Sequence, residues 1–305
     1  MTSGTIPSSG IQRAAVPTGV ELAYETFGDP SHPPVVLVMG LATQMLGWPA
    51  EFCSELTRRQ HFVVRFDNRD IGLSTHLDDA PRADPLAAFA GDTSSASYTL
   101  SDMAADTTGL LDALGIEAAH VVGASMGGMI AQTLALEHPE RVRSLTSIMS
   151  STGDRRVGQA TEAALAALFA PPATSRESAI ERTLRTYRVI GSPGFEFDEE
   201  ALRERAGLSY DRGYDPPGIA RQLTAIYASG DRSQELSRLR IPTLVVHGAE
   251  DPLVQVSGGR ATATAIPGAE LIVIDGMGHD LPRELWPQLA EHIADLVARA
   301  EAGGA

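Results

Sequence analysis

The sequence is short of the residues that several protein classes require. It has one cysteine in 305 residues, Cys53, which excludes a disulfide framework and a thiolate metal cluster. Aromatic residues make up only 5% of the chain, and it contains no run of Lys and Arg. The formal net charge is −15, whereas a surface that binds nucleic acid needs clustered cations. We therefore expect no nucleic-acid partner.

Long apolar runs are also absent. No segment approaches the roughly 18 uninterrupted apolar residues that cross a bilayer. The first ten residues, MTSGTIPSSG, have neither the basic start nor the apolar stretch of a signal peptide. We expect a soluble, cytoplasmic protein with no membrane partner, and the sequence specifies no oligomeric state. Its 43% of apolar residues are enough for one large core.

The chain does contain a regular alternation of apolar runs and amphipathic stretches. Helical periodicity occurs over residues 100–115, 129–140 and 285–300. The later apolar runs are continuous, as in strands that are buried on both faces of a parallel sheet. This order predicts an α/β fold with a doubly wound, mostly parallel sheet. The runs that predict its strands are 20–28, 34–40, 61–67, 120–125, 142–150, 242–248 and 269–275.

The alternation stops between residues 152 and 238, where only helical stretches occur. Strands return after residue 240, so we expect a helical cap inserted into the sheet domain; an independent second domain is the alternative. The predicted organisation is a mobile N-terminus over 1–10, a core formed by 11–151 and 239–305, and a cap over 152–238.

Residues 119–130, AHVVGASMGGMI, place a serine between a strand pattern and a helix pattern. Gly123 to Gly127 fit G-x-S-x-G, with Ser125 at the centre. That spacing predicts a tight strand-to-helix turn with Ser125 at positive φ. Glycines two residues before and after the serine let neighbouring backbone pass without a Cβ clash. A plain glycine-rich turn in which Ser125 caps the helix is the alternative.

A serine nucleophile needs a base, and the base needs an orienting carboxylate. His279 is the predicted base because it lies in a glycine-flanked loop after the last apolar run. Asp251 is the predicted acid, in the turn after run 242–248; Glu250 is its nearest rival and Asp275 a weaker one. His247 ends a strand and could pack near the site. The remaining histidines have structural interpretations: His32, His61, His76, His120, His138 and His292.

The tetrahedral oxyanion of such a reaction needs two preorganised donors. We predict the backbone N–H groups of Met126, directly after the nucleophile, and of Leu41, which follows Gly40 in the loop after run 34–40. No histidine–carboxylate cluster has metal-ligand spacing, and Gly276 and Gly278 do not extend to a dinucleotide fingerprint. No metal and no cofactor are expected.

Four motifs occur in the order and approximate spacing of one family: FDNRDIGLS (66–74), GASMGG (123–128), HGAEDPLV (247–254) and GMGHDLP (276–282). On these motifs the chain resembles the α/β-hydrolase superfamily over residues 12–300. The resemblance departs from the family at Asp70, where glycine is usual. We interpret the 66–74 stretch as a structural turn that braces the nucleophile region through Arg69.

The loop LVMGLATQMLGWPAEF (37–52) has Met39 where a histidine is common in the superfamily. In this form it is similar to the aclacinomycin methylesterase group and to serine-dependent macrolide esterases. That resemblance implies a carboxylic ester of a bulky, apolar or polyketide-type molecule, either a methyl ester or a macrolactone. Cap side chains that could line its pocket are Leu168, Phe169, Tyr187, Phe195, Tyr210 and Tyr227.

Two other functions use the same fold. A C–C bond hydrolase acting on vinylogous diketones would employ the same triad, and a non-catalytic binding protein would recognise a small molecule without cleaving it. Epoxide hydrolases and haloalkane dehalogenases of this fold need an aspartate at the nucleophile position, so Ser125 excludes them. The presence of candidates for all three triad positions favours a serine hydrolase that forms an acyl-enzyme.

Overall fold

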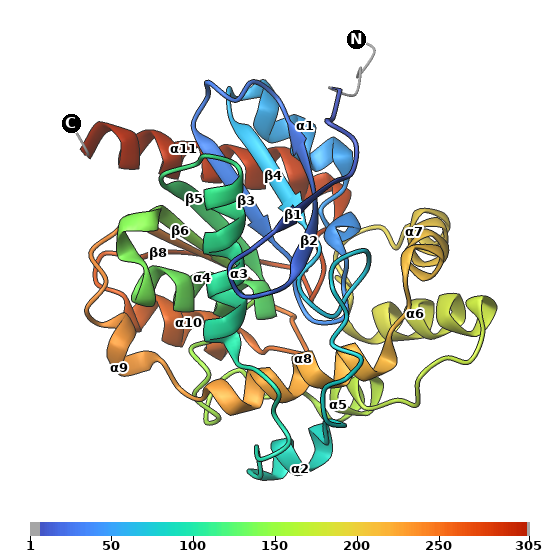
Figure 1. Cartoon of the computed structure of the whole chain (residues 1–305). Coiled ribbons are helices and arrows are strands. Elements are labelled where there is room, and N and C mark those ends of the chain that lie inside the picture. Colours follow the sequence, from blue (N-terminus) through green and yellow to red (C-terminus); the bar gives the residue numbers. More distant parts are fainter. Residues whose placement is uncertain (1–6, 304–305) are drawn as a thin grey trace.

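A computed structural model describes residues 7–303 of the chain. In that part an eight-stranded sheet forms the centre of the molecule, in the order β1-β2-β4-β3-β5-β6-β7-β8 (Figure 1). The strands β1 and β2 and the pair β2 and β4 are antiparallel, and all other neighbours are parallel. The strands are β1 Gln12–Ala15, β2 Glu21–Phe27, β3 Pro34–Val38, β4 Phe62–Phe66, β5 Ala119–Ala124, β6 Val142–Ile148, β7 Thr243–Gly248 and β8 Glu270–Ile274.

Each of the seven apolar runs forms a strand, so the predicted mostly parallel α/β sheet is confirmed. β1 was not predicted, because its sequence QRAA is short and mostly exposed. In the register of β3 and β5, Val38 lies opposite Gly123. The carboxyl ends of these two strands therefore meet, which brings the loop after β3 beside the turn after β5.

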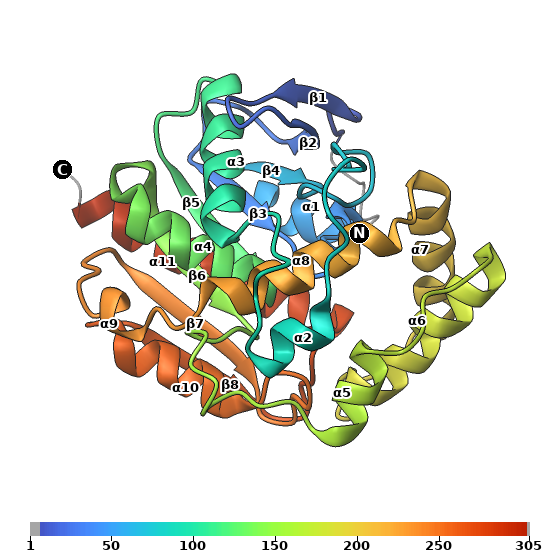
Figure 2. The ribbon, with the colours of Figure 1, turned by 60° about the horizontal axis from the view of Figure 1, so that its bottom comes forward.

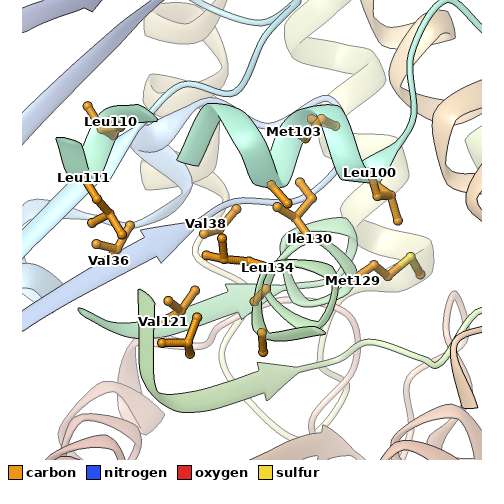
Figure 3. Close-up of a cluster of buried hydrophobic side chains, with 14 of the residues drawn as sticks. Val36, Val38, Leu100, Met103, Leu110, Leu111, Val121, Met129, Ile130 and Leu134 are labelled. Atoms are coloured by element: carbon orange, nitrogen blue, oxygen red, sulfur yellow. The ribbon is translucent and has the colours of Figure 1, made fainter. Parts of the chain in front are cut away.

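Helices cover both faces of the sheet. α1 (Ala50–Arg58) and α11 (Trp286–Gly303) pack on one face, where they share a core with β3, β5 and β7. α3 (Leu100–Ala113) and α4 (Met126–Glu137) pack on the other face. Figure 3 shows Leu110 and Leu111 of α3 and Ile130 of α4 with the valines of β3 and β5. The helix α10 (Val256–Ala265) joins β7 to β8, and the short α2 (Pro85–Ala90) precedes α3.

The chain between β6 and β7 forms the inserted helices α5 to α9. Figure 2 shows α5, α6 and α7 at the side of the sheet domain, with α8 running back towards it. Side-chain caps fix the starts of the first three, from Thr161, Ser175 and Asp198. The five are α5 Glu162–Leu168, α6 Arg176–Ile190, α7 Glu199–Arg212, α8 Pro216–Ser229 and α9 Ser233–Leu236; the three short 3-10 helices of the described residues are η1 Met45–Gly47, η2 Pro139–Arg141 and η3 Arg283–Leu285.

At the N-terminus, the segment 1–10 predicted to be mobile lies partly outside the described residues. Within the described part, the Ser9 N–H donates to the Thr26 carbonyl of β2 at 2.9 Å. None of the helices in residues 7–303 is long and apolar enough to cross a membrane.

Candidate active site

Ser125 occupies the single residue between β5 and α4. Its backbone has φ 55° and ψ −119°, a left-handed conformation that is rare for a non-glycine residue and stores strain. A Cβ at Gly123 would overlap the Gly127 carbonyl, and one at Gly127 would overlap the Val38 carbonyl. Both glycines are therefore required for this turn. The Ser125 hydroxyl makes no capping hydrogen bond to α4, so the helix-cap alternative does not describe it.

The three side chains proposed as a triad from the sequence lie in one hydrogen-bonded row. His279 Nε2 is 2.9 Å from Ser125 Oγ, and His279 Nδ1 is 2.7 Å from Asp251 Oδ2. The other oxygen of Asp251 accepts the N–H groups of Leu253 and Val254, each at 2.9 Å. These bonds hold the carboxylate facing the ring. An ionised carboxylate at this place keeps the proton on Nδ1 and leaves Nε2 free to accept from the serine hydroxyl.

The Asp251 side chain is 0% exposed, and burial alone would raise the pKa of its carboxyl. The charge of His279 and hydrogen bonds from His247 and His279 outweigh burial and hold the pKa below its usual range. His279 dominates, because the His247 ring is 3.5 Å from the carboxylate but only 2.7 Å from the Val254 carbonyl. Asp251 is therefore an anion at neutral pH.

The alternative acids lie apart from His279. Both Glu250 and Asp275 are exposed, and Glu250 Oε2 accepts the Gly276 N–H at 2.5 Å. Of the other histidines, only His247 reaches the triad, through its contact with Asp251. This agrees with the expectation that His247 packs near the site without serving as the base.

The loop after β3 passes directly over Ser125. A Cβ at Gly40 would lie 3.0 Å from the Ser125 Cβ, so glycine permits the close approach. Leu41 and Met126 both line the same cavity as Ser125. Within residues 7–303, no protein acceptor pairs with the N–H of either residue. The two predicted oxyanion donors are thus two unpaired backbone amides that line the same cavity as the Ser125 hydroxyl.

A glutamine of α8 holds this loop, and no sequence motif indicated it. The Ala42 N–H donates to Gln222 Oε1 at 3.1 Å, and Gln222 Nε2 donates to the Arg69 carbonyl at 2.8 Å. Gln222 is fully buried, while Ala42 has φ 59°. The inserted helix therefore fixes the residue next to Leu41 in a strained turn.

The turn 66–74 holds helices and the loop after β3, where Asn68 Nδ2 donates to the Met39 carbonyl at 2.9 Å, rather than Ser125 itself. The Arg69 guanidinium donates to both oxygens of Asp106 on α3, each at 2.6 Å, and no bond joins it to Ser125 in the described chain. Asp70 has φ 65°, which explains why glycine is usual there. Its carboxylate accepts from Arg221 of α8 at 2.9 and 2.7 Å. Asp70 is therefore more strained at this positive φ than glycine would be, but its side chain forms an ion pair with Arg221 of the inserted helix α8.

A cavity of 720 Å³ opens over Ser125 and His279, between the carboxyl ends of the strands and the inserted helices. Of the six cap side chains expected to line it, two do not. Phe169 packs edge-on against Phe89 at 5.8 Å, and Phe195 packs against the sheet core. Those that line the cavity are Leu168, Tyr187, Tyr210 and Tyr227.

One group in the described residues has the composition of a metal site. Ligand atoms of Asp70, His76 and Asp215 lie within 4.8 Å of one another. Their lone pairs are already used, because Asp70 accepts from Arg221 while His76 is 2.7 Å from Asp215 Oδ2. We interpret the group as an ion-pair network between the turn 66–77 and α8.

Comparison with known proteins extends these observations. Residues 33–282 match the model of the family described as alpha/beta hydrolase fold. The chain is 32% identical to the rhodomycin D methylesterase DnrP of Streptomyces peucetius over 295 residues, which cover 90% of this chain and 94% of that protein. It is 27% identical to 3-oxoadipate enol-lactonase 2 of Acinetobacter baylyi, covering 92% and 94%.

Solved structures give the same fold. A meta-cleavage product hydrolase of Pseudomonas fluorescens superposes with a TM-score of 0.73 at 21% identity, covering 97% of this chain and 99% of that one. The enol-lactonase of Burkholderia xenovorans gives 0.69 at 24% identity, covering 94% and 100%.

Proposed function

Because this chain belongs to the α/β-hydrolase fold family, we propose that it is a serine esterase that cleaves a carboxylic ester through an acyl-enzyme at Ser125. The observation that carries the proposal is the row Asp251, His279 and Ser125, with separations of 2.7 and 2.9 Å. A serine is activated when a base lies within hydrogen-bond reach of its hydroxyl and a carboxylate orients that base.

In the proposed reaction, Ser125 Oγ attacks the ester carbonyl carbon while His279 Nε2 takes the hydroxyl proton. The N–H groups of Leu41 and Met126 receive the oxyanion. The alcohol leaves with the proton from His279, and water, activated by the same ring, then releases the acid. Asp251 holds the ring and stabilises the imidazolium without becoming protonated.

We propose a bulky, polyketide-type substrate, either a methyl ester or a macrolactone. The 720 Å³ cavity falls in the range of about 300–1,000 Å³ that is usual for sites of drug-sized ligands. The identity of 32% to a rhodomycin D methylesterase, over 90% of this chain, supports the methyl ester.

A C–C bond hydrolase is the second candidate. It is favoured by 31% identity to a 2-hydroxy-6-oxononadienedioate/2-hydroxy-6-oxononatrienedioate hydrolase of Paraburkholderia phymatum, although only over 56% of this chain. If the protein cleaves a diketone ring-fission product and is inactive on every ester, the C–C bond hydrolase would replace the esterase as the proposed function.

The experiment compares wild type with Ser125→Ala on 4-nitrophenyl butyrate, and then on a panel of methyl esters and macrolides followed by mass spectrometry. We expect Ser125→Ala to lose roughly 10⁴-fold or more in kcat. Ser237→Ala, at an exposed serine outside the cavity, is the matched control. A hydrolysed macrolide gains the mass of water, whereas a methyl ester loses its methyl group. Full activity in Ser125→Ala would overturn the proposal.

A further inference from the structure

Two arginines face the cavity from the inserted helices, away from the triad. Arg182 lies on α6 and Arg205 on α7, and both line the cavity. Figure 2 shows these helices side by side at the edge of the molecule. Their neighbours in the cavity wall recur at helical spacing, so each arginine lies on the inner face of its helix. These neighbours include Ala179, Thr183 and Thr186 of α6 and Leu202, Ala206 and Ser209 of α7.

Neither guanidinium has a carboxylate partner among the described residues. Arg182 donates from Nη2 to the Ala170 carbonyl at 3.3 Å, and its buried Nε has no partner. Arg205 lies over the Tyr187 ring at 5.8 Å. Leaving a buried cationic donor unpaired is costly. It is also unexpected in a chain with 39 acidic and 24 basic residues.

Arginines on the outer faces of the same helices are paired. Arg176 bonds Asp211 at 2.8 Å, Arg188 bonds Glu199 at 2.6 Å, and Arg203 bonds Glu181 at 3.0 Å. These three side chains do not line the cavity. Acidic residues are therefore available on both helices, but they are placed on the side that faces away from the cavity.

The acidic groups in the cavity wall do not neutralise the pair. Asp154 is bonded to Arg156 at 2.8 Å. Asp280 accepts a short hydrogen bond from Ser192, and burial raises the pKa of its carboxyl. Arg205 acts on Asp280 only through space. The cavity wall thus carries three arginines, Arg155, Arg182 and Arg205, against these two aspartates, in a protein of net charge −15.

We propose that Arg182 and Arg205 form a carboxylate-binding site, so that the ester cleaved at Ser125 also carries a second, free carboxylate group. This inference rests on the proposed esterase function and names the class of its substrate. The planar guanidinium presents paired N–H donors that match the two oxygens of a carboxylate. A carboxylate at this place would neutralise the two guanidinium groups that line the cavity and anchor the substrate away from the reacting carbonyl.

The test uses 4-nitrophenyl monoesters of succinate, adipate and suberate, each beside the same compound with its free carboxylate converted to a methyl ester. Wild type is expected to prefer the anionic member at its best chain length by about tenfold or more in kcat/KM. Arg182→Gln and Arg205→Gln should each remove most of this preference, mainly through KM for the anionic member. Arg185→Gln is the control, since Arg185 is exposed on α6 and does not line the cavity, and it should change neither the preference nor 4-nitrophenyl butyrate hydrolysis.

Equal kcat/KM values for the anionic and methylated members at every length in wild type would overturn the inference, as would an unchanged preference in both glutamine variants. Arg182→Lys and Arg205→Lys keep the positive charge but lose the paired N–H donors of the guanidinium, so they should retain part of the preference. This result would distinguish a loss of carboxylate recognition from a loss of folding. Hydrolysis of 4-nitrophenyl butyrate by wild type, and its loss in Ser125→Ala, tests the esterase proposal separately.

Discussion

Helix α8 and helices α6 and α7 belong to one insertion but are held in different ways. The last residue of α7, Arg212, pairs with Asp67 of the sheet domain at 2.5 Å, whereas the contacts between α6 and α7 include exposed ion pairs. Arg221 of α8 pairs with Asp70 of the sheet domain, and these side chains are 3% and 0% exposed. Arg176 and Asp211 join α6 to α7 with side chains 51% and 53% exposed. The apolar cluster of α6–α7 is small and largely its own: Ile180, Leu184, Leu202 and Ala206, with Tyr187 packed against it.

The two kinds of attachment correspond to two roles of the inserted helices. The buried polar contacts of α8 hold the Gly40–Ala42 turn, whose position the proposed chemistry needs within a fraction of an ångström. The helices α6 and α7 carry the two arginines without carboxylate partners and the inner wall of the cavity. Substitutions of the buried polar residues of α8 should therefore affect stability and kcat, and those of Arg182 on α6 and Arg205 on α7 should affect substrate choice.

The largest effect is expected from breaking the buried ion pair. Asp70→Asn keeps the shape and tolerates positive φ, but it leaves Arg221 only the more distant carboxylate of Asp215, at 3.6 Å. Removing one partner of a buried pair costs about 3–5 kcal/mol, and we expect a loss near the lower end, because the amide oxygen still accepts one bond. Urea unfolding measures it. A loss below about 1 kcal/mol would mean that the pair behaves like a surface pair.

A smaller effect is expected at Gln222. Gln222→Met removes the acceptor of the Ala42 N–H and should lower kcat by about tenfold, less than the 10²–10³-fold cost of deleting an oxyanion donor. KM should change little, since α6 and α7 are untouched. Gln234→Met on α9 is the exposed control. An unchanged kcat would show that α8 does not position the loop.

The third prediction concerns pH and the start of α8. Burial lowers the pKa of His76, but the Gly72 carbonyl and Asp215 favour the charged ring and hold its pKa above 6.5. A raised folded-state pKa contributes stability that is complete below the unfolded value, about 6.5, and is lost as pH rises through the folded value. The free energy of unfolding lost in His76→Gln should therefore be larger at pH 6 than at pH 9. A loss that is independent of pH would contradict this.

The smallest effect is expected for the exposed pair of α6–α7. Asp211→Asn should cost no more than about 1 kcal/mol, measured in the same urea titration as Asp70→Asn. The contrast between the two asparagine variants tests the comparison itself. Equal losses would mean that exposure does not distinguish the two attachments.

Much of this organisation could be predicted because its signals are local. The strands follow from continuous apolar runs, and the Ser125 turn from glycines two residues away on either side. Asp251 and His279 stand in loops directly after strands, so their approach follows from a parallel sheet. β1 was not predicted, because its four mostly exposed residues form no continuous apolar run.

The contacts of α8 could not be predicted, because their partners are distant in sequence. Gln222 is 180 residues from Ala42, and Arg221 is 151 from Asp70. Nor could the unpaired state of Arg182 and Arg205 be predicted, since each directly follows a glutamate in the sequence. Only the orientation of α6 and α7 places these arginines inward.

The most direct test of the central claim is mass spectrometry of the wild-type enzyme, quenched with acid during turnover of 4-nitrophenyl butyrate, an activated ester from which the acyl-enzyme forms readily. We predict an increase equal to one butyryl group, located by peptide mapping on Ser125 and absent from Ser125→Ala. Hydrolysis without any acyl adduct, or an adduct on another residue, would contradict the acyl-enzyme mechanism at Ser125.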